Sequence, residues 1–312
     1  MQILVAGGTN FIGRSIVSTL SRHHTVSVLN RGSRPVADGR IRHLIADRNE
    51  PDVLRELFAD SDAFDVVVDV SATDPNHVRG LLGGLGEQLP RAYVLISSAA
   101  VYTPGAAYPI REDSHVGGDP VWGGYGEDKA ACEELVRASG IEEVTILRPP
   151  YVYGPENNED REKWLWARMA AGEPIFVPSD GRALIQFCHV DHLASVVEEV
   201  VDRRATPGTY NVGTATSYTF NDYLALLAEV SGHPAHLLHT GEAAVAARSY
   251  FPFRDMDLVL DMDRLTRVGL ATGPDLRTGL QQTWEWLKRS GVPDYVPTKQ
   301  ESEWAKALLD GQ

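Results

Sequence analysis

The sequence predicts an α/β protein with a doubly wound parallel sheet and a smaller α/β lobe. In the first half of the chain, short runs of Val, Ile and Leu alternate with segments whose apolar residues recur at helical spacing. Most of these runs are continuous, as in strands that helices cover on both faces. Past Gly154-Pro155 the alternation becomes irregular, which indicates the second lobe.

The elements of the first half follow from this alternation. The first helix, for example, has Phe11, Ile16 and Leu20 on one face. We expect strands at Gln2–Ala6, Thr25–Leu29, Ile41–Ile45, Val66–Val70, Ala92–Ser97 and Val144–Leu147, and helices at Phe11–Arg22, Pro51–Ala59, His77–Gln88 and Tyr125–Ser139.

The second half predicts shorter strands and longer gaps. The tail from Pro293 is polar, and we expect it to be partly disordered. We expect helices at Asp160–Gly172, Asp191–Arg203, Phe220–Ser231 and Leu276–Ser290, and strands at Ile175–Val177, Ile185–His189 and Gly208–Val212.

Composition limits the function classes. The 312 residues carry a net charge of −14, which argues against a nucleic-acid partner because phosphate binding needs a basic face. No apolar run approaches the ~20 residues of a spanning helix, and the first run is too short for a signal peptide, so no membrane partner is expected. The two cysteines, Cys132 and Cys188, form no disulfide framework, so we interpret them as buried fillers and expect a cytoplasmic location.

A glycine-rich loop follows the first strand and opens the first helix. Gly7 permits a tight turn and Gly13 permits close helix–strand contact, with Thr9, Asn10, Phe11 and Ile12 between them. A dinucleotide pyrophosphate needs such a loop at a helix N-terminus. Asn10 stands where glycine is usual, and we expect it to tolerate left-handed backbone geometry or to reach a phosphate. The loop indicates a dinucleotide-binding (Rossmann) unit over 1–155 plus about 185–212, with a substrate lobe over about 156–184 and 213–312.

The end of the second strand bears on the choice between NAD and NADP. An acidic residue there would hold a ribose hydroxyl and repel a 2′-phosphate. This chain has Asn30, Arg31 and Arg34 instead, and guanidinium groups suit a phosphate, so we favour NADP over NAD. The alternative is that both arginines are solvated loop residues. Asp47, after the third strand, is placed to approach the adenine.

Three residues predict proton transfer to or from the oxygen of a carbon that carries a hydroxyl or carbonyl. Tyr125 and Lys129 are four residues apart and share a helix face. A nearby ammonium lowers the pKa of a phenol, which is near 10 when unperturbed, and so makes the phenol a usable acid/base. Lys129 is also placed to bind the nicotinamide ribose. Ser98 follows a strand at its carboxyl end, where its hydroxyl can bond the reacting oxygen.

These motifs together resemble the extended short-chain dehydrogenase/reductase family, the NAD-dependent epimerase/dehydratase group. The resemblance covers roughly residues 2–287 and implies Tyr125 as acid/base, Lys129 as its partner, and Ser98 as hydroxyl donor. It also implies that Ser71 and Pro150 lie by the cofactor, and that two copies associate as a homodimer through the helix with Tyr125. The matching segments are the glycine loop, 65–72, 97–102, 125–129, 148–155 and 187–194.

The departures from that family concern the substrate. Ala99-Ala100 stand where family dehydratases have an Asp-Glu pair, so elimination by that route is unsupported. Tyr151 stands in place of a diphosphate-binding asparagine and Ile185 in place of an arginine, while Arg254 matches a phosphate-binding arginine. The chain therefore resembles a divergent branch, which is also similar to chloroplast RNA-binding relatives.

The aromatic residues of the second lobe allow two interpretations. Trp164, Trp166, Tyr250, Phe251 and Phe253 are either pocket walls or core. We favour core for Trp164 and a pocket for the loop with Tyr250 and Arg254, and we keep Tyr151, Trp164, Tyr250 and Arg254 as substrate-binding candidates.

The histidines at the junction between the strand Ile185–His189 and the helix that follows it predict no metal site. His189 and His192 lack a third ligand, and we expect Asp191 to cap the following helix.

The sequence thus predicts an NAD(P)-dependent oxidoreductase that acts on a small sugar-like or tailoring-pathway substrate. Net epimerisation results if the cofactor stays bound, and net reduction or oxidation if the cofactor exchanges. A nucleotide-sugar epimerase with retained NAD is one alternative. A non-catalytic cofactor- or RNA-binding relative is the other.

Overall fold

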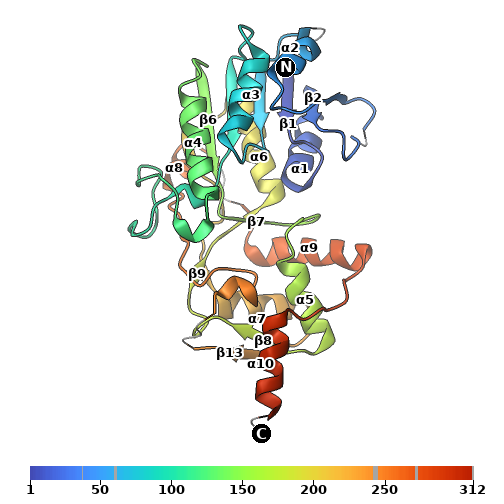
Figure 1. The fold of residues 1–312 in the computed structure, drawn as a ribbon, viewed down its shortest axis with the longest axis vertical. Coiled ribbons are helices and arrows are strands. Elements are labelled where there is room, and N and C mark those ends of the chain that lie inside the picture. The colour runs from blue at the N-terminus through green and yellow to red at the C-terminus, as the bar shows by residue number, and fades with distance from the viewer. Residues whose placement is uncertain (37, 60–61, 242–244, 271–272, 311–312) are drawn as a thin grey trace. The chain divides into compact units, whose positions relative to one another are not determined.

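The computed structural model describes residues 1–36, 38–59, 62–241, 245–270 and 273–310. The chain forms two compact units, and each is built from three separate segments (Figure 1). Unit 1 contains Met1–Val152, Phe187–Ala215 and Leu260–Pro274. Unit 2 contains Tyr153–Gln186, Thr216–Val259 and Asp275–Gln312. Residues 260–274 therefore fall in unit 1, whereas the sequence places all of 213–312 in the smaller lobe.

Unit 1 is built on a seven-stranded sheet with the order β11-β6-β5-β4-β1-β2-β3. Each neighbouring pair is parallel. This order, with the chain starting in the middle and winding outward in both directions, confirms the predicted doubly wound fold. The strands are β1 (Gln2–Ala6), β2 (Thr25–Asn30), β3 (Arg42–Ile45), β4 (Val66–Asp69), β5 (Ala92–Ile96), β6 (Glu143–Arg148) and β11 (Thr209–Asn211).

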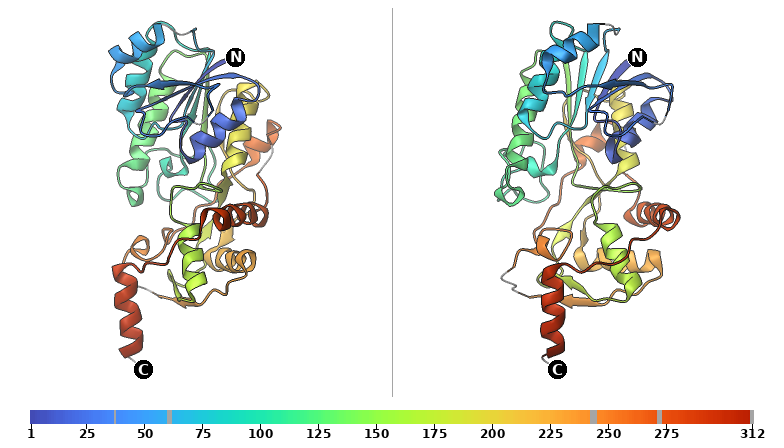
Figure 2. Two further views of the ribbon diagram at one scale, coloured as in Figure 1. Left: turned by 90° about the vertical axis from the view of Figure 1, so that its right-hand side faces the viewer. Right: turned by 45° about the vertical axis from the view of Figure 1, so that its right-hand side comes forward.

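Helices cover both faces of this sheet (Figure 2). Side chains alternate along β1, so Ile3 and Val5 join the core on one face while Leu4 and Ala6 join the core on the other. The first core includes α1 and α6, and the second includes α2, α3 and α4. The helices of unit 1 are α1 (Phe11–Leu20), α2 (Pro51–Ala59), α3 (Pro75–Leu85), α4 (Tyr125–Arg137), α6 (Val190–Val201) and α8 (Asp263–Arg267), with short 3-10 turns η1 (Ala99–Val101) and η2 (Pro120–Trp122).

Both cysteines are buried in these two cores, as predicted. Cys132 lies in the core with α4 and Cys188 in the core with α6. Burial raises the pKa of the Cys132 thiol to about 11 and raises that of Cys188 as well. Both thiols are therefore protonated and inert at neutral pH.

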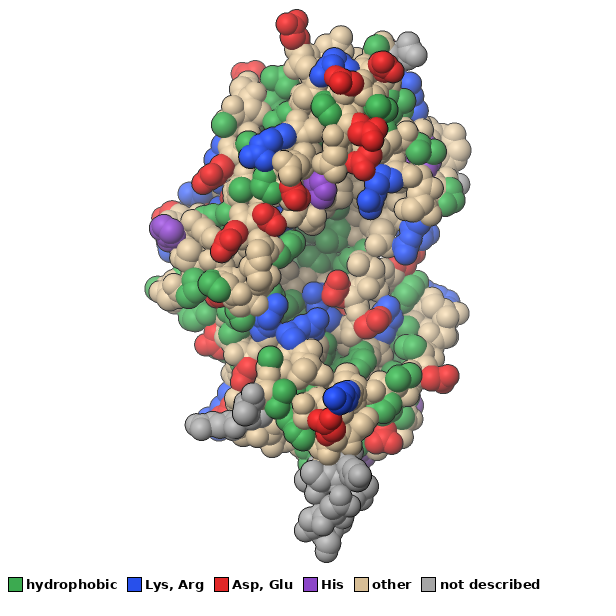
Figure 3. All heavy atoms as spheres, in the orientation of Figure 1, with side chains coloured by type: hydrophobic (Ala, Val, Ile, Leu, Met, Phe, Trp, Pro, Cys, Tyr) green, Lys and Arg blue, Asp and Glu red, His purple; other side chains and the backbone are tan. Residues whose placement is uncertain are grey.

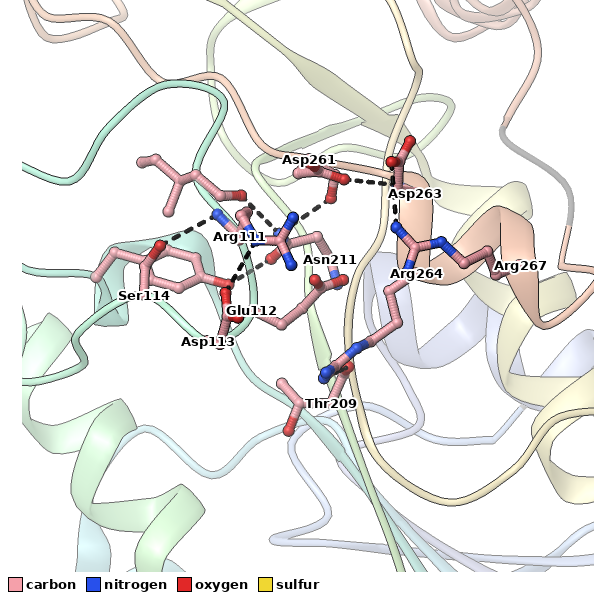
Figure 4. Close-up of polar contacts among 12 residues, drawn as sticks. Arg111, Glu112, Asp113, Ser114, Thr209, Asn211, Asp261, Asp263, Arg264 and Arg267 are labelled. Atoms are coloured by element: carbon pink, nitrogen blue, oxygen red, sulfur yellow. Dashed lines mark hydrogen bonds and ion pairs between the residues drawn. The ribbon is translucent and has the colours of Figure 1, made fainter.

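One asparagine ties two loop segments to the edge of the sheet (Figure 4). The side-chain amide of Asn211, on β11, donates to the carbonyls of Ile110 and Asp261 at 3.0 and 3.1 Å. Its main-chain N–H donates to the Glu112 carboxylate at 3.0 Å. Because β11 is an edge strand, these bonds satisfy backbone groups that would otherwise lie unpaired beside the last strand.

Unit 2 is made of helices and short strand pairs. The strands β8 (Ile175–Val177) and β13 (Leu237–His239) pair in parallel, and β9 (Leu184–Ile185) and β12 (Tyr218–Thr219) pair antiparallel. Two further short strands, β7 (Tyr151–Tyr153) and β10 (Phe187–His189), pair with each other; β10 and the first two residues of β7 belong to unit 1. The helices are α5 (Glu162–Ala171), α7 (Phe220–Ser231), α9 (Leu276–Ser290) and α10 (Lys299–Asp310), with a 3-10 turn η3 (Ala247–Ser249).

The prediction of a partly disordered tail is wrong for residues 299–310, which form α10 (red in Figure 1). A capping box starts this helix: Thr298 Oγ1 accepts the Glu301 N–H at 3.2 Å, and the Glu301 carboxylate accepts the Thr298 N–H at 2.6 Å. The Glu301 carboxylate also forms a buried ion pair with Arg168 of α5. A polar sequence thus becomes an ordered helix because its few buried groups find partners in unit 2.

The surface carries both signs of charge. On the face shown in Figure 3, acidic and basic side chains are interspersed over each unit. Within the described part of the chain, no helix has the length and apolar character needed to span a bilayer.

Candidate active site at the carboxyl ends of the strands

The glycine loop between β1 and α1 requires glycine at both of its ends. Gly7 has a φ of +93°, and a Cβ atom there would lie 2.6 Å from Cβ of Ser71. A Cβ atom on Gly13 would lie 1.9 Å from the Gly7 carbonyl oxygen. The loop is therefore packed against the segment after β4, with Ser71 directly beside it, and the contact of Ser71 with a cofactor stays a prediction.

Asn10 does not adopt the left-handed geometry expected of it. It is extended, with φ −135° and ψ 144°, and Phe11 instead takes a positive φ of 31°. Asn10 is the N-cap of α1, but its side chain makes no capping hydrogen bond. Its Oδ1 accepts from Arg34 at 2.6 Å. The first-turn amides of α1, from Phe11 and Ile12 onward, therefore have no side-chain cap, which is the state that suits a phosphate ligand.

The loop after β2 is organised by Asn30. Its Nδ2 donates to Thr9 Oγ1 at 3.0 Å, and its Oδ1 accepts the Gly32 N–H at 2.7 Å. Asn30 thus joins the glycine loop to the loop that contains the two arginines. Arg31 is exposed, while Arg34 lies against Asn10.

The adenine candidate lies at the end of the next strand. Asp47 is half-buried, and its carboxylate accepts the N–H of Asn49 at 2.9 Å. This bond fixes the turn between β3 and α2.

The three predicted catalytic residues lie at the carboxyl side of β4 and β5. Ser98 follows β5 as the N-cap of η1, and its Oγ accepts the Ala100 N–H at 3.2 Å. Tyr125 is the first residue of α4 and is 40% exposed. Lys129, one turn later, is only 2% exposed. A half-exposed phenol and a buried ammonium thus share one helix face, as the spacing predicts.

Lys129 is fixed by two backbone carbonyls. Its Nζ donates to Ala72 O at 2.7 Å and to Ile96 O at 2.6 Å, just beyond β4 and at the end of β5. An ammonium has three donors, so one remains for a ligand. Burial lowers the pKa of Lys129 to about 8, against the opposing influence of Asp69.

A close helix contact places Tyr125 next to the turn that carries Ser98. A Cβ atom on Gly126 would lie 2.3 Å from the Ala100 carbonyl oxygen. Gly118, with φ +83°, touches the same turn of α4, since a Cβ there would lie 2.4 Å from the Glu127 nitrogen. The first turn of α4 therefore packs backbone to backbone against η1. The spacing of Tyr125 and Lys129 alone does not reveal these contacts, although the glycine that follows Tyr125 was a usable signal.

The segment after β6 lies beside the same turn. The Ala99 N–H donates to the Pro149 carbonyl at 2.9 Å, which brings Pro150 to this end of the sheet. Tyr151 is 7% exposed, and its ring centre lies 6.3 Å from that of Trp122 and 6.4 Å from that of Phe187. The Pro150 and Tyr151 backbone thus belongs to unit 1, with the catalytic candidates.

The substrate candidates of the second lobe all belong to unit 2. The Trp164 ring is half-buried, with the Arg168 guanidinium 5.1 Å from its centre. Arg254 is half-buried in the loop after Phe253. Their contact with substrate stays a prediction.

The rings around Arg254 serve the core of unit 2. Tyr250 is 2% exposed and packs edge-on against Trp304, with ring centres 4.6 Å apart. Phe251 and Phe253 are buried and both contact Phe220. The structure therefore favours the core interpretation of this loop over the pocket interpretation, because interlocking rings leave little surface for a ligand.

His189 caps a helix, and His192 lies two residues into it. The N-cap of α6 is His189, whose Nδ1 accepts the Asp191 N–H at 3.3 Å, so the prediction that Asp191 caps this helix is wrong. The Asp191 carboxylate instead accepts from Ser15 at 2.8 Å. Burial lowers the pKa of His192 to about 4. Among the described residues, no three His, Cys, Asp or Glu side chains are grouped as metal ligands are.

Two buried ion pairs near the site were not anticipated. Arg148 pairs with Glu133 of α4, whose carboxylate also accepts from Ser97 at 2.6 Å. Arg48 pairs with Asp69 at the end of β4. A charged residue at the end of a buried apolar strand was the available signal for both, since such a charge requires a partner.

Comparison with known proteins gives concordant results. A family model described as the NAD dependent epimerase/dehydratase family matches residues 3–213. The chloroplast stem-loop binding protein of 41 kDa b from Arabidopsis thaliana is 30% identical over 305 residues, covering 91% of this chain and 78% of that protein. The dTDP-4-dehydro-6-deoxy-D-allose reductase of Streptomyces bikiniensis is 26% identical over 326 residues, covering 92% and 96%. The UDP-glucuronic acid 4-epimerase of Bacillus cereus, solved in complex with NAD, superposes with a TM-score of 0.75 at 19% identity, covering 93% and 99%.

Proposed function

We propose a function from one premise: the chain belongs to the NAD dependent epimerase/dehydratase family and is an NAD(P)-dependent enzyme of the short-chain dehydrogenase/reductase type. The proposed reaction interconverts a secondary alcohol and a ketone on a sugar-like substrate. One observation supports this most: the buried Lys129 ammonium lies one helical turn from the half-exposed Tyr125 phenol.

Each residue has a role that follows from its position. Tyr125 gives or takes the proton of the reacting oxygen, because its hydroxyl is on the exposed first turn of α4. Lys129 favours the phenolate electrostatically and keeps one N–H for a ligand hydroxyl. Ser98 donates to the reacting oxygen. A bound dinucleotide would supply or accept the hydride through its nicotinamide, and the amides of α1 and the surface of Gly7 would hold its pyrophosphate.

The substrate is proposed to differ from a typical nucleotide sugar. The two residues of η1 that stand in place of the Asp-Glu pair are Ala99 and Ala100. Both are buried, and neither has a carboxylate for elimination. Ile185, which replaces an arginine of the family, is fully buried in unit 2 and cannot contact a diphosphate. These features favour a reductase acting on a sugar-like or tailoring-pathway ketone. A nucleotide-sugar epimerase that retains NAD is the alternative, in line with the names of the structural relatives.

Replacing Tyr125 with Phe tests the mechanism. The variant keeps the ring and loses only the hydroxyl, so turnover should fall by a factor of 10² to 10⁴ while the dinucleotide Kd stays within a few-fold. Turnover is followed by nicotinamide absorbance with a panel of sugar ketones, and binding by calorimetry. Trp122→Phe, next to this helix, is a control for local packing. Full turnover in Tyr125→Phe would refute the assignment.

Replacing Arg34 tests the preference for NADP. Arg34 lies on Asn10 at the glycine loop, so a 2′-phosphate near the end of β2 is within reach of this guanidinium or of Arg31. In Arg34→Ala and Arg31→Ala, the Kd for NADPH should rise about ten-fold or more and that for NADH should change less. Arg22→Ala, an exposed arginine beyond the C-terminal end of α1, is the control. Equal effects on both dinucleotides would assign the arginines to the surface.

The dinucleotide that the purified protein releases on denaturation separates reductase from epimerase. Stoichiometric retained NAD favours an epimerase that restores its cofactor in place. An empty protein that binds NADPH selectively favours a reductase with exchanging cofactor.

A second function, binding of RNA stem-loops, is favoured by the 30% identity with the chloroplast stem-loop binding protein. The net charge of −14 opposes it. Titration of a labelled RNA hairpin at two salt concentrations tests it. Micromolar affinity with a steep salt dependence supports RNA binding, and no detectable binding leaves the enzymatic reaction as the proposed function.

We also propose a cytoplasmic location and a homodimer. The location is supported by two buried free cysteines. Dimerisation through α4 follows the family alone, and light scattering at several concentrations checks it.

A further inference from the structure

Asp69 is a fully buried carboxylate that organises the turn after β4. Its Oδ1 accepts the N–H groups of Ser71 and Ala72 at 3.2 and 3.1 Å, and its Oδ2 accepts the Tyr93 hydroxyl at 2.7 Å. Arg48 donates to both oxygens in a fork, at 2.8 Å to Oδ1. The carboxylate therefore has a donor on every side, which is what a buried charge requires.

Arg48 extends this arrangement to two other segments. It is 9% exposed, and its Nε donates to the His77 carbonyl at 3.0 Å while its Nη1 also donates to Ser71 Oγ at 3.0 Å. The guanidinium thus joins the loop after β3, the turn after β4 and the start of α3. A planar fork holds this geometry in a way that a lysine cannot.

The turn held by Asp69 touches both halves of the candidate site. Ser71 lies against Gly7 of the glycine loop. The carbonyl oxygen of the next residue, Ala72, accepts a hydrogen bond from the Lys129 ammonium at 2.7 Å. The Asp69 carboxylate thus binds the N–H of the same residue whose carbonyl holds Lys129. We propose that Arg48 and Asp69 form a positioning pair that fixes the Ser71–Ala72 turn, and through it places and electrostatically sets the Lys129 ammonium.

The charges around Lys129 support this role, which rests on the proposed function of Lys129. Asp69 on β4 raises the pKa of Lys129, and Arg48 lowers it. From α4 itself, the Glu133 carboxylate also raises it, and Cys132 does so only as a thiolate. Because the two members of the pair act in opposite directions, removing either one should shift the titration of Lys129, each with its own sign.

Lys129 can be observed directly, because the sequence contains only five lysines. Lysine labelled with ¹³C at Cε gives five signals, and Lys129→Met assigns the buried one. In Asp69→Asn the titration midpoint of Lys129 should move down by about one pH unit, and in Arg48→Met it should move up by a similar amount. The alkaline limb of the kcat/KM profile should move with it.

The control is a second arginine–carboxylate site on the same sheet. Glu143 begins β6 and pairs with Arg91 and Arg203, and none of these three residues is among the groups that chiefly shift the pKa of Lys129. Glu143→Gln should leave the Lys129 midpoint unchanged. Equal midpoints in Asp69→Asn, Arg48→Met and Glu143→Gln would overturn the proposal, and so would shifts of the same sign in the first two.

Arg48→Lys covers the case in which the neutral variants do not fold. It keeps a charge opposite Asp69 but loses the fork, so the midpoint of Lys129 should stay near that of the native protein while kcat falls roughly ten-fold. An unchanged kcat in a folded Arg48→Lys variant overturns the positioning role. If Asp69→Asn and Arg48→Met shift the Lys129 midpoint in opposite directions but leave turnover unchanged, the electrostatic role of the pair stands and the proposed catalytic role of Lys129 is refuted.

Discussion

At the scale of single residues, Lys129 combines burial with a charge. Two carbonyls satisfy two of its donors, yet the surrounding protein still lowers its pKa to about 8 from 10.5. Below pH 8 the ammonium is present and able to act on Tyr125. Above that pH it is lost in the folded protein, although the unfolded chain would keep it to about pH 10.5.

This pKa predicts opposite pH trends for activity and stability. Turnover should decrease as the pH rises through about 8, because the ammonium disappears. Between about pH 8 and 10.5 the unfolded state binds more protons at this residue than the folded state, so its contribution to the free energy of unfolding should rise, by about 3 kcal/mol in total. Urea unfolding of the native protein and of Lys129→Met across this range isolates the effect. A constant difference between the two would contradict the lowered pKa.

Residue identity also shows what could be predicted near the cofactor. Gly7 and Gly13 were identified from spacing because only glycine fits their close contacts. The conformation of Asn10 could not be predicted, since the positive φ moved to Phe11. Partners such as Arg34 for Asn10 and Arg48 for Asp69 lie more than twenty residues apart, and local pattern carries no information about them.

At the scale of elements, the contact between α4 and η1 sets the geometry of the site. The Gly126 backbone lies so close to the Ala100 carbonyl that a side chain has no room. This contact explains how a helix that begins at Tyr125 and a turn that begins at Ser98 stay in register. Backbone contacts of this kind are stiffer than contacts between side chains, which have rotamers to adjust.

Gly126→Ala should therefore impair activity more than stability. The added methyl group would lie 2.3 Å from a backbone oxygen, so α4 must shift away from η1. We expect a loss of about 1–3 kcal/mol of stability, partly offset by the better helix propensity of alanine, and a fall in turnover of ten-fold or more. Gly124→Ala is the matched control, because the nearest atom to its Cβ would lie at 3.9 Å. Thermal unfolding and kcat distinguish the two; equal behaviour of both variants would remove the role of the contact.

Element boundaries were predictable where local signals were complete. The helix Phe220–Ser231 matches the prediction at both ends, because Thr219 and Asp222 form a capping box and Gly232 ends it in left-handed geometry. The same type of signal, Thr298 with Glu301, starts the helix of the tail, whose polar composition predicts disorder instead. The strand β13 was missed, because its pairing with β8 joins residues about sixty positions apart.

At the scale of the whole molecule, the two units rely on different kinds of core. Unit 1 is held by aliphatic side chains on both faces of a sheet. Unit 2 is rich in aromatic contacts, such as Trp166 against Trp284 and Tyr223 against Phe253. Its C-terminal helix is attached through the ion pair of Arg168 with Glu301, both 1% exposed.

Removing one partner of this ion pair should destabilise unit 2 strongly. Glu301→Ala leaves the Arg168 charge buried without its carboxylate and removes the cap of α10, at a cost of about 3–5 kcal/mol. Glu303→Ala is the control, since Glu303 forms an exposed pair with Lys299 at 3.7 Å that is worth less than about 1 kcal/mol. Urea unfolding followed by tryptophan fluorescence measures both. A small effect of Glu301→Ala would mean that α10 is attached by other contacts.

The interleaving of the two units has a consequence for synthesis on the ribosome. Unit 1 takes its final segment, Leu260–Pro274, from near the end of the 312-residue chain, and the strand β11 at its sheet edge follows the first segment of unit 2. A nascent chain cannot close the sheet with its own edge strand until residue 211 has left the exit tunnel, nor complete unit 1 until residue 274 has left it. Until residue 211 has emerged, β6 is the outermost strand on its side of the sheet. Its open backbone is then exposed to pairing with other chains, so chaperone dependence should be concentrated in this stage of translation.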